Sequence, residues 1–183
     1  MILSEIRKER VKNECIKGAQ KYNRLIGKHF EITIENGEAY IVQFNKEDFQ
    51  HLTGVNSTFT NRAFFTNCLN ATITCQNITD YQSKDWNTIK SKLKIIVDID
   101  KLIYGNINDV LLLDVLHTPT CDFPIALRND VKDATVAFID RNLHARSLRK
   151  ARHSLEVDNT YRIVKIREKM KTESDYTKVI YSK

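Results

Sequence analysis

The sequence predicts an α+β fold from three patterns: a mainly helical first half, a strand-rich second half and an early hairpin. Residues 1–26 carry apolar side chains at close to helical spacing, which indicates an amphipathic helix. Alternating apolar residues fill 29–34 and 39–44, and the Asn-Gly pair between these runs is a strong hairpin signal. We therefore expect an N-terminal helix over 1–27 and a single α+β domain over 28–183.

Three further helices are expected before the strand-rich half. A short helix follows Asn45, which can act as its N-cap, and ends at Gly54, which can adopt the left-handed conformation that closes a helix. A second helix covers about 60–71, and a third starts after the N-cap candidate Ser83. Part of the third helix, residues 93–99, also fits a strand, so its end stays open.

The second half contains apolar runs bounded by turn residues. Residues 108–117 suit a buried strand or a short helix, whereas 124–128 and 133–140 are typical of strands. Two more alternating runs, 161–167 and 176–181, lie near the C-terminus. These runs supply the strands of the expected α+β fold.

Composition narrows the class of protein. The chain is 42% hydrophobic with five Gly and two Pro, which indicates a folded protein. No apolar run approaches the ~20 residues that cross a bilayer, and charges occupy the place of a signal peptide's apolar core. We therefore expect a cytoplasmic protein with no membrane partner. The four cysteines show no zinc-site spacing and are interpreted as small hydrophobic residues, so we expect no metal and no cofactor.

Positive charge is concentrated in the C-terminal part of the chain. Between residues 141 and 171 there are ten basic and three acidic residues, whereas the rest of the chain is close to neutral. Such a region attracts polyanions, most commonly nucleic acid, although it also fits an ordinary solvated surface. We predict RNA as the partner, with nucleic-acid contacts from His144, Arg146, Lys150 and Arg152.

His51 is the first candidate for chemistry. It lies in the short helix beside the apolar residues Phe49 and Leu52, which should fix its position in the fold. Histidine can give or take a proton near neutral pH, but a lone histidine is as often structural. Phosphate-binding loops, dinucleotide fingerprints, nucleophile elbows and kinase motifs are absent from the sequence. Proton transfer beside a phosphate is therefore the chemistry that we favour for His51.

The segment 141–150 offers the groups that metal-independent RNA cleavage needs. It contains a hydroxyl in Ser147, a second imidazole in His144 and fixed positive charge in Arg149 and Lys150. The reaction requires a base for the ribose 2′-hydroxyl, an acid for the departing 5′ oxygen and a cation for the phosphorane. The same residues also fit phosphate contacts without catalysis.

The order of these features resembles the phage branch of the barnase–EndoU–colicin–RelE-like nuclease superfamily. The matching parts are Tyr40–Phe44, Asp48–Gly54, the lysine-rich stretch Lys90–Lys94, the strands around 124–140 and Ser147-Leu148. The resemblance implies a small curved antiparallel sheet packed against helices, with RNA cleavage or a related toxin role. It carries over His51, with Thr53 and Gly54 beside it, and Ser147.

The sequence thus predicts a metal-independent endoribonuclease or toxin-like protein of phage or prophage type. His51 would be the general acid or base, Ser147 would orient the phosphate, and Arg149 and Lys150, chosen from local charge, would hold it. Thr53 would contact the nucleic acid, and a toxin role implies an antitoxin or immunity protein as partner. The alternative is a non-enzymatic phage protein that binds RNA, or a host nucleic-acid-binding protein, through its basic face.

Overall fold

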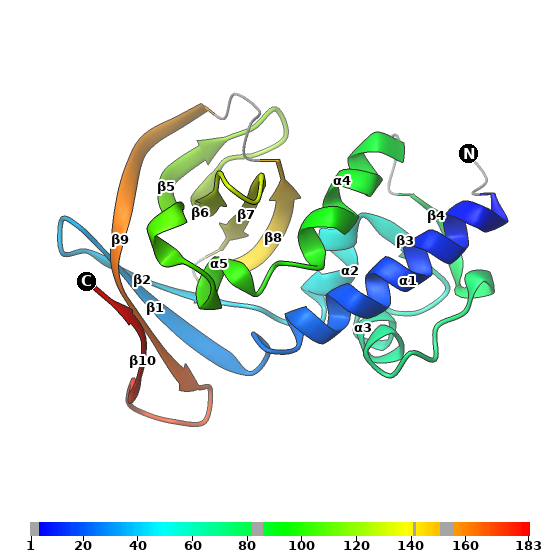
Figure 1. Cartoon of the computed structure of the whole chain (residues 1–183), viewed down its shortest axis with the longest axis horizontal. Helices are drawn as coiled ribbons and strands as arrows, with labels where there is room; N and C mark the ends of the chain where they lie inside the picture. Colours follow the sequence, from blue (N-terminus) through cyan, green and yellow to red (C-terminus); the bar gives the residue numbers. More distant parts are fainter. Residues whose placement is uncertain (1–3, 82–85, 141, 151–155) are drawn as a thin grey trace.

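The computed structural model describes residues 4–81, 86–140, 142–150 and 156–183. A group of helices lies beside a barrel of β-strands, with the N-terminal helix on the side away from the barrel's long outer strands (Figure 1). No helix among the described residues is long and apolar enough to cross a membrane.

The helical part is held together by α1 (Glu5–Tyr22), which packs against the third and fourth helices through Val11, Cys15 and Ala19. These side chains are fully buried and spaced four residues apart, as the amphipathic pattern predicts. Gly18 allows the close approach of the fourth helix, because a Cβ there would lie 2.8 Å from the Ile96 side chain. The other elements of this part are α2 (Asp48–Thr53), β3 (Val55–Ser57), α3 (Asn61–Leu69), η1 (Cys75–Asn77), β4 (Ile78–Tyr81) and α4 (Trp86–Ile96).

The predicted helices are present, with different ends. The first stops at Tyr22 instead of residue 26, and Thr60 caps α3 by accepting a hydrogen bond from the Ala63 backbone. The strand alternative for residues 93–99 is wrong, because Ile89, Leu93 and Ile96 lie on one buried face of α4. Ser83, the expected cap of that helix, lies outside the described residues.

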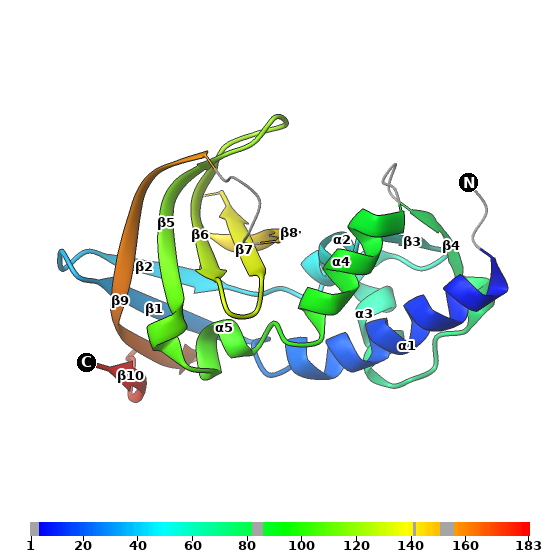
Figure 2. The ribbon, with the colours of Figure 1, turned by 45° about the horizontal axis from the view of Figure 1, so that its top comes forward.

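Seven strands form a closed barrel, and an eighth pairs on its outside. The order around the barrel is β1 (Lys28–Ile34), β2 (Ala39–Gln43), β8 (His144–Arg149), β7 (Ala134–Ile139), β6 (Phe123–Asn129), β5 (Val110–His117) and β9 (Glu156–Met170), which returns to β1. The extra strand β10 (Lys178–Ser182) pairs with β9. Every pairing is antiparallel except β2–β8, which is parallel and has one residue pair, Gln43 with His144. Figure 2 shows the long, bent β9 along one side of the barrel.

The expected small curved antiparallel sheet is therefore wrong, because the sheet is a closed barrel of mixed strands. Closure depends on β1–β9 and β2–β8, which join segments far apart in sequence. Alternating patterns predict that strands exist and which face is buried, but they do not choose partners over such separations. The early hairpin, by contrast, is confirmed, with its turn at Gly37.

The barrel interior is apolar and continuous with the core between the helices. Leu112, Leu127 and Val136 pair across three neighbouring strands and lie in this core. The short helix α5 (Lys101–Tyr104) and the turn η2 (Ile107–Asp109) add Leu102, Ile103 and Ile107 to it. On the opposite, outward face a second buried cluster contains Leu113, Leu116, Phe123, Ala126 and Ala137. Burial on both faces explains why these strands appear as continuous apolar runs in the sequence.

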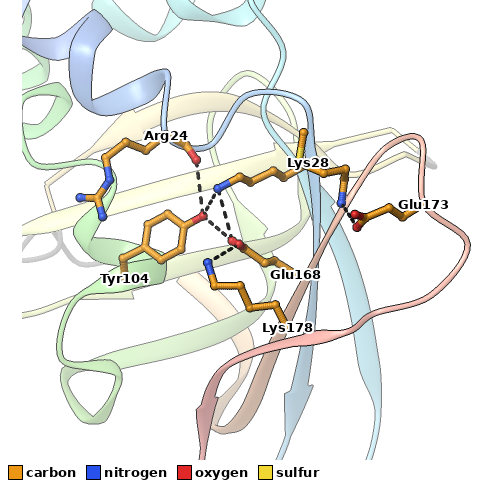
Figure 3. Close-up of polar contacts among 7 residues, drawn as sticks. Arg24, Lys28, Tyr104, Glu168, Glu173 and Lys178 are labelled. Carbon is orange, nitrogen blue, oxygen red and sulfur yellow. Dashed lines mark hydrogen bonds and ion pairs between the residues drawn. The ribbon is translucent and has the colours of Figure 1, made fainter.

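A buried polar cluster fastens α5 and β10 to the barrel (Figure 3). The Glu168 carboxylate accepts hydrogen bonds from Tyr104 Oη at 2.5 Å and Lys178 Nζ at 2.6 Å. Lys28 Nζ donates to Tyr104 Oη at 2.7 Å, and the Arg24 guanidinium lies 5.0 Å from the centre of the Tyr104 ring. Burial alone raises the pKa of Glu168, but the hydrogen bonds from Lys178 and Tyr104 and the nearby ammonium charges outweigh it, so the pKa is lowered. This cluster satisfies its own charges, which indicates a structural role.

Replacing Glu168 by Gln should lower the free energy of unfolding at pH 7 by about 1–3 kcal/mol, since charge-assisted hydrogen bonds to a buried carboxylate are lost. The folded-state pKa is lowered, so this stabilisation is present above the unfolded-state pKa of about 4.3 and is lost as pH falls through the folded-state pKa. Urea unfolding at pH 7 and at pH 3 measures both values. The difference between wild type and Glu168→Gln should shrink at pH 3, whereas a constant difference would contradict this account. The exposed Glu156 on the same strand, changed to Gln, is the control.

Candidate functional site

The elements α2, α4 and β8 meet where the barrel is most weakly closed. One edge of β8 pairs regularly with β7, but its other edge meets β2 only at the Gln43–His144 pair. The helices α2 and α4 pack against β8 at this place, and both lie beside it in Figures 1 and 2. Side chains from distant parts of the sequence are thereby gathered at one junction.

His144, at the start of β8, lies between two carboxylates. Its Nδ1 is 3.0 Å from Asp48 Oδ2, and its Nε2 is 3.0 Å from Asp140 Oδ2. Asp48 is only 5% exposed, and the Asn45 side chain donates to it over 3.2 Å. Asp140 follows β7 with a positive φ of 65° and is exposed. The buried carboxylate thus fixes the orientation of the ring, and the exposed one contacts its solvent side.

His51 lies three residues after Asp48 on α2, so the two side chains share one side of the helix. His51 is partly buried, and its backbone oxygen accepts a hydrogen bond from Lys92 Nζ on α4 at 3.4 Å. Lys92 is itself 9% exposed, so this junction contains a buried ammonium group as well as two imidazoles. His51 and His144 thus lie on two elements, α2 and β8, that pack against each other.

Gly54 ends α2 in the left-handed conformation, with φ of 71°, as the sequence predicts. A Cβ at this position would also lie 2.8 Å from the terminal methyl group of Ile89 on α4, so a larger residue would displace that side chain as well as strain the backbone. The N-terminal end differs from the prediction, because α2 begins at Asp48 with Glu47 in the N-cap position. The Asn45 side chain instead contacts the carboxylate that holds His144.

Thr53 is fully buried at the end of α2. Its hydroxyl donates to the Gln50 carbonyl at 2.7 Å and accepts from the Val55 backbone N–H at 3.3 Å. These bonds shape the step from the helix into β3. The structure thus places the Thr53 hydroxyl inside the fold, where backbone groups engage it.

The segment 141–150, expected to carry phosphate-binding groups, contains the strand β8 with a β-bulge. The pairing shifts from Ala137–Ser147 to Phe138–Ala145, so Arg146 is the extra residue and is exposed. Because of the bulge, His144, Ser147 and Arg149 share the outward face, while Ala145 and Leu148 face the core. Lys150 follows the strand and is partly buried, and Arg152 lies outside the described residues.

Arg149 has no ion pair or hydrogen bond with another described residue, and its Nε is buried. Its guanidinium is therefore available to an anion on the outward face of β8. Four other basic residues of the C-terminal region are not its neighbours, since they lie on β9, which three strands separate from β8: Arg162, Lys165, Arg167 and Lys169. One of them, Arg167, is engaged by Glu31 through its Nε at 2.8 Å.

Sequence reasoning missed Asp48, Lys92 and Asp140 as parts of this site. In the sequence, Asp48 is only the first residue of the Asp48–Gly54 stretch, although its spacing of three from His51 is that of two side chains on one helix face. Asp140 precedes His144 by four residues across a turn, a spacing that has no meaning until the two strands are known to pair. Lys92 gave no signal beyond its place in the lysine-rich stretch.

The chain matches the model of the phage-Barnase-EndoU-ColicinE5/D-RelE like nuclease4 family over residues 16–182. It therefore belongs to this nuclease family, and the resemblance seen in the sequence is confirmed. Membership indicates a nuclease or toxin type of function with nucleic acid as substrate. No curated protein and no solved structure matches the chain.

The Asp48–His144 contact should be measurable as a coupling energy. Asp48→Asn and His144→Gln should each destabilise the fold, and their effects should be non-additive by about 0.5–3 kcal/mol because the two groups are in direct contact. A double-mutant cycle by urea unfolding gives this value. The matched cycle with Asp140→Asn should give less, since Asp140 is exposed. Additive effects of Asp48→Asn and His144→Gln would show that the contact is not formed in solution.

Proposed function

We propose that this protein is a metal-independent endoribonuclease that uses two histidines at the α2–β8 junction. The observation that carries the proposal is the contact of His144 with the buried Asp48, on the same helix that carries His51. The buried Asp48 carboxylate at Nδ1 holds the imidazole in a fixed orientation, and proton transfer to substrate at Nε2 requires the exposed Asp140 side chain to move off that nitrogen. Family membership supports the nuclease part of the proposal.

The reaction needs two proton transfers. One imidazole takes the proton of the ribose 2′-hydroxyl, whose oxygen attacks the adjacent phosphorus. The bond from phosphorus to the 5′ oxygen breaks, and the other imidazole, in its protonated form, donates a proton to that oxygen. The products are a 2′,3′-cyclic phosphate and a free 5′-hydroxyl. His51 and His144 divide these roles, and Asp48 positions His144.

Charge development on the phosphorane requires fixed cations and donors. Arg149 and Ser147 lie on the same outward face of β8 as His144 and supply one guanidinium and one hydroxyl. Lys150 follows directly, and the Lys92 ammonium lies beside His51. Arg149 and Lys150 would hold the phosphate and Ser147 would orient it. With RNA as substrate, the enzyme would act in the cytoplasm, where an antitoxin or immunity protein would protect the cell that makes it.

The separate changes His51→Ala and His144→Ala should each reduce RNA cleavage by about a hundredfold or more, since each removes one proton-transfer group. Cleavage of total RNA in the presence of a chelator, with detection of 2′,3′-cyclic phosphate ends, measures this loss. His117→Ala, at the end of β5, which two strands separate from β8, is the control and should retain activity.

Three outcomes would contradict the proposal. Full activity of both variants would exclude the histidine pair, and loss of wild-type cleavage on chelation would exclude the metal-independent reaction. Binding of RNA by the wild type without any cleavage would identify a binding protein instead.

A further inference from the structure

Three arginines lie in one cross-strand row on the outside of the barrel. The strand register pairs Arg162 of β9 with Leu111 of β5, Leu111 with Arg128 of β6, Arg128 with Thr135 of β7, and Thr135 with Arg149 of β8. Residues paired directly across a sheet share one face, so these five side chains follow one line. With neighbouring strands about 4.8 Å apart, the row is about 19 Å long.

The groups in this row are poorly satisfied by the protein itself. Thr135 is fully buried, yet its hydroxyl has no hydrogen-bond partner, and neither Arg149 nor the exposed Arg162 has an ion pair with another described residue. Arg128 is engaged by Asp130, with Nε 3.1 Å from Oδ1. Buried hydroxyls without a partner are rare because they lose water without compensation. Because Thr135 is fully covered, an anion would reach this part of the row through the guanidinium groups of Arg128 and Arg149 on either side of it.

A cavity of about 420 Å³ lies at the far end of the row. Arg162 and Leu111 belong to both the row and the cavity wall, so the two features are continuous. Tyr181 lines the cavity together with Asn108, to which its hydroxyl donates at 3.0 Å, and Val131. Two carboxylates also line it, but Asp130 is paired with Arg128 and Asp109 accepts from Asn106. The cavity thus offers an aromatic ring, an amide and an apolar side chain beside the exposed guanidinium of Arg162.

This combination is typical of single-stranded nucleic-acid binding, in which cations follow the phosphates and an aromatic side chain stacks with a base. An adjacent phosphate on Arg162 would leave a base free to enter the cavity against the Tyr181 ring. A duplex would not offer that base, because its bases are paired and stacked.

We propose that the row from Arg149 to Arg162 is the binding track for a single-stranded nucleic-acid substrate, and that the Tyr181 cavity binds one of its bases. The track begins on the face of β8 that carries His144 and Ser147, so it leads the strand away from the scissile phosphate. The direction of the track rests on the proposed function, because that function places the reacting phosphate at β8. The track itself is testable without cleavage.

Binding of a fluorescein-labelled single-stranded DNA oligonucleotide, followed by anisotropy, tests the track. DNA lacks the 2′-hydroxyl and is not cleaved by the proposed reaction, so failure of catalysis and failure of the track are separable. Arg162→Ala and Arg149→Ala should each weaken binding and lower the slope of log K against log salt by about 0.7. Arg10→Ala, an exposed arginine of α1, is the matched control and should leave the slope unchanged.

Three further variants separate binding from folding. Thr135→Val removes a fully buried hydroxyl that has no partner to lose, so it should leave the midpoint of urea unfolding unchanged or raise it, and it should leave binding unchanged. Tyr181→Ala should weaken binding about fivefold or more at an unchanged salt slope, whereas Tyr181→Phe should bind as the wild type does. Wild-type affinity in Arg162→Ala and Tyr181→Ala, or tighter binding of a duplex of the same sequence, would overturn the proposal.

Discussion

The fold depends on the pairing of β9 with β1, which closes the barrel. β9 is 15 residues long and pairs first with β5 and then with β1, so it joins the β1–β2 hairpin to the meander of β5, β6, β7 and β8. The Glu168 cluster sits on this seam and ties α5 and β10 to it. Without the seam, the hairpin would share few backbone hydrogen bonds with the other strands, and both sheets would expose edges.

The barrel also closes between β2 and β8, where the pairing is much shorter than between β9 and β1, and the candidate site lies at this short pairing. β2 and β8 share one residue pair, so most of that edge of β8 is covered by α2 and α4 instead of a strand. Helix side chains can carry charge to such an edge, and Asp48, His51 and Lys92 are placed there in this way. A site at an imperfect seam also leaves the outward face of β8 continuous with the meander, where the arginine row begins.

Sequence reasoning gave most elements of the fold and part of the site. The hairpin around Gly37, the left-handed end of α2 at Gly54 and the strands of the second half other than β8 follow from spacing and turn chemistry within a few residues. The family was also visible from the His51 segment. The closed barrel could not be predicted, because an alternating pattern shows which face of a strand is buried but does not show which strand lies next to it. The strand β8 was hidden by its basic, polar composition and its bulge at Arg146.

The sequence by itself determined the local units: an amphipathic first helix, a glycine-terminated helix with His51, an Asn-Gly hairpin and a charged C-terminal region. Only the tertiary structure decided which of these meet. Asp48 and His144 are 96 residues apart in the chain but 3.0 Å apart in space, and Arg162 and Arg149 are aligned only through three intervening strands. The local units form through contacts between residues that are close in sequence. Contacts between distant units depend instead on strand register and on packing over the whole core.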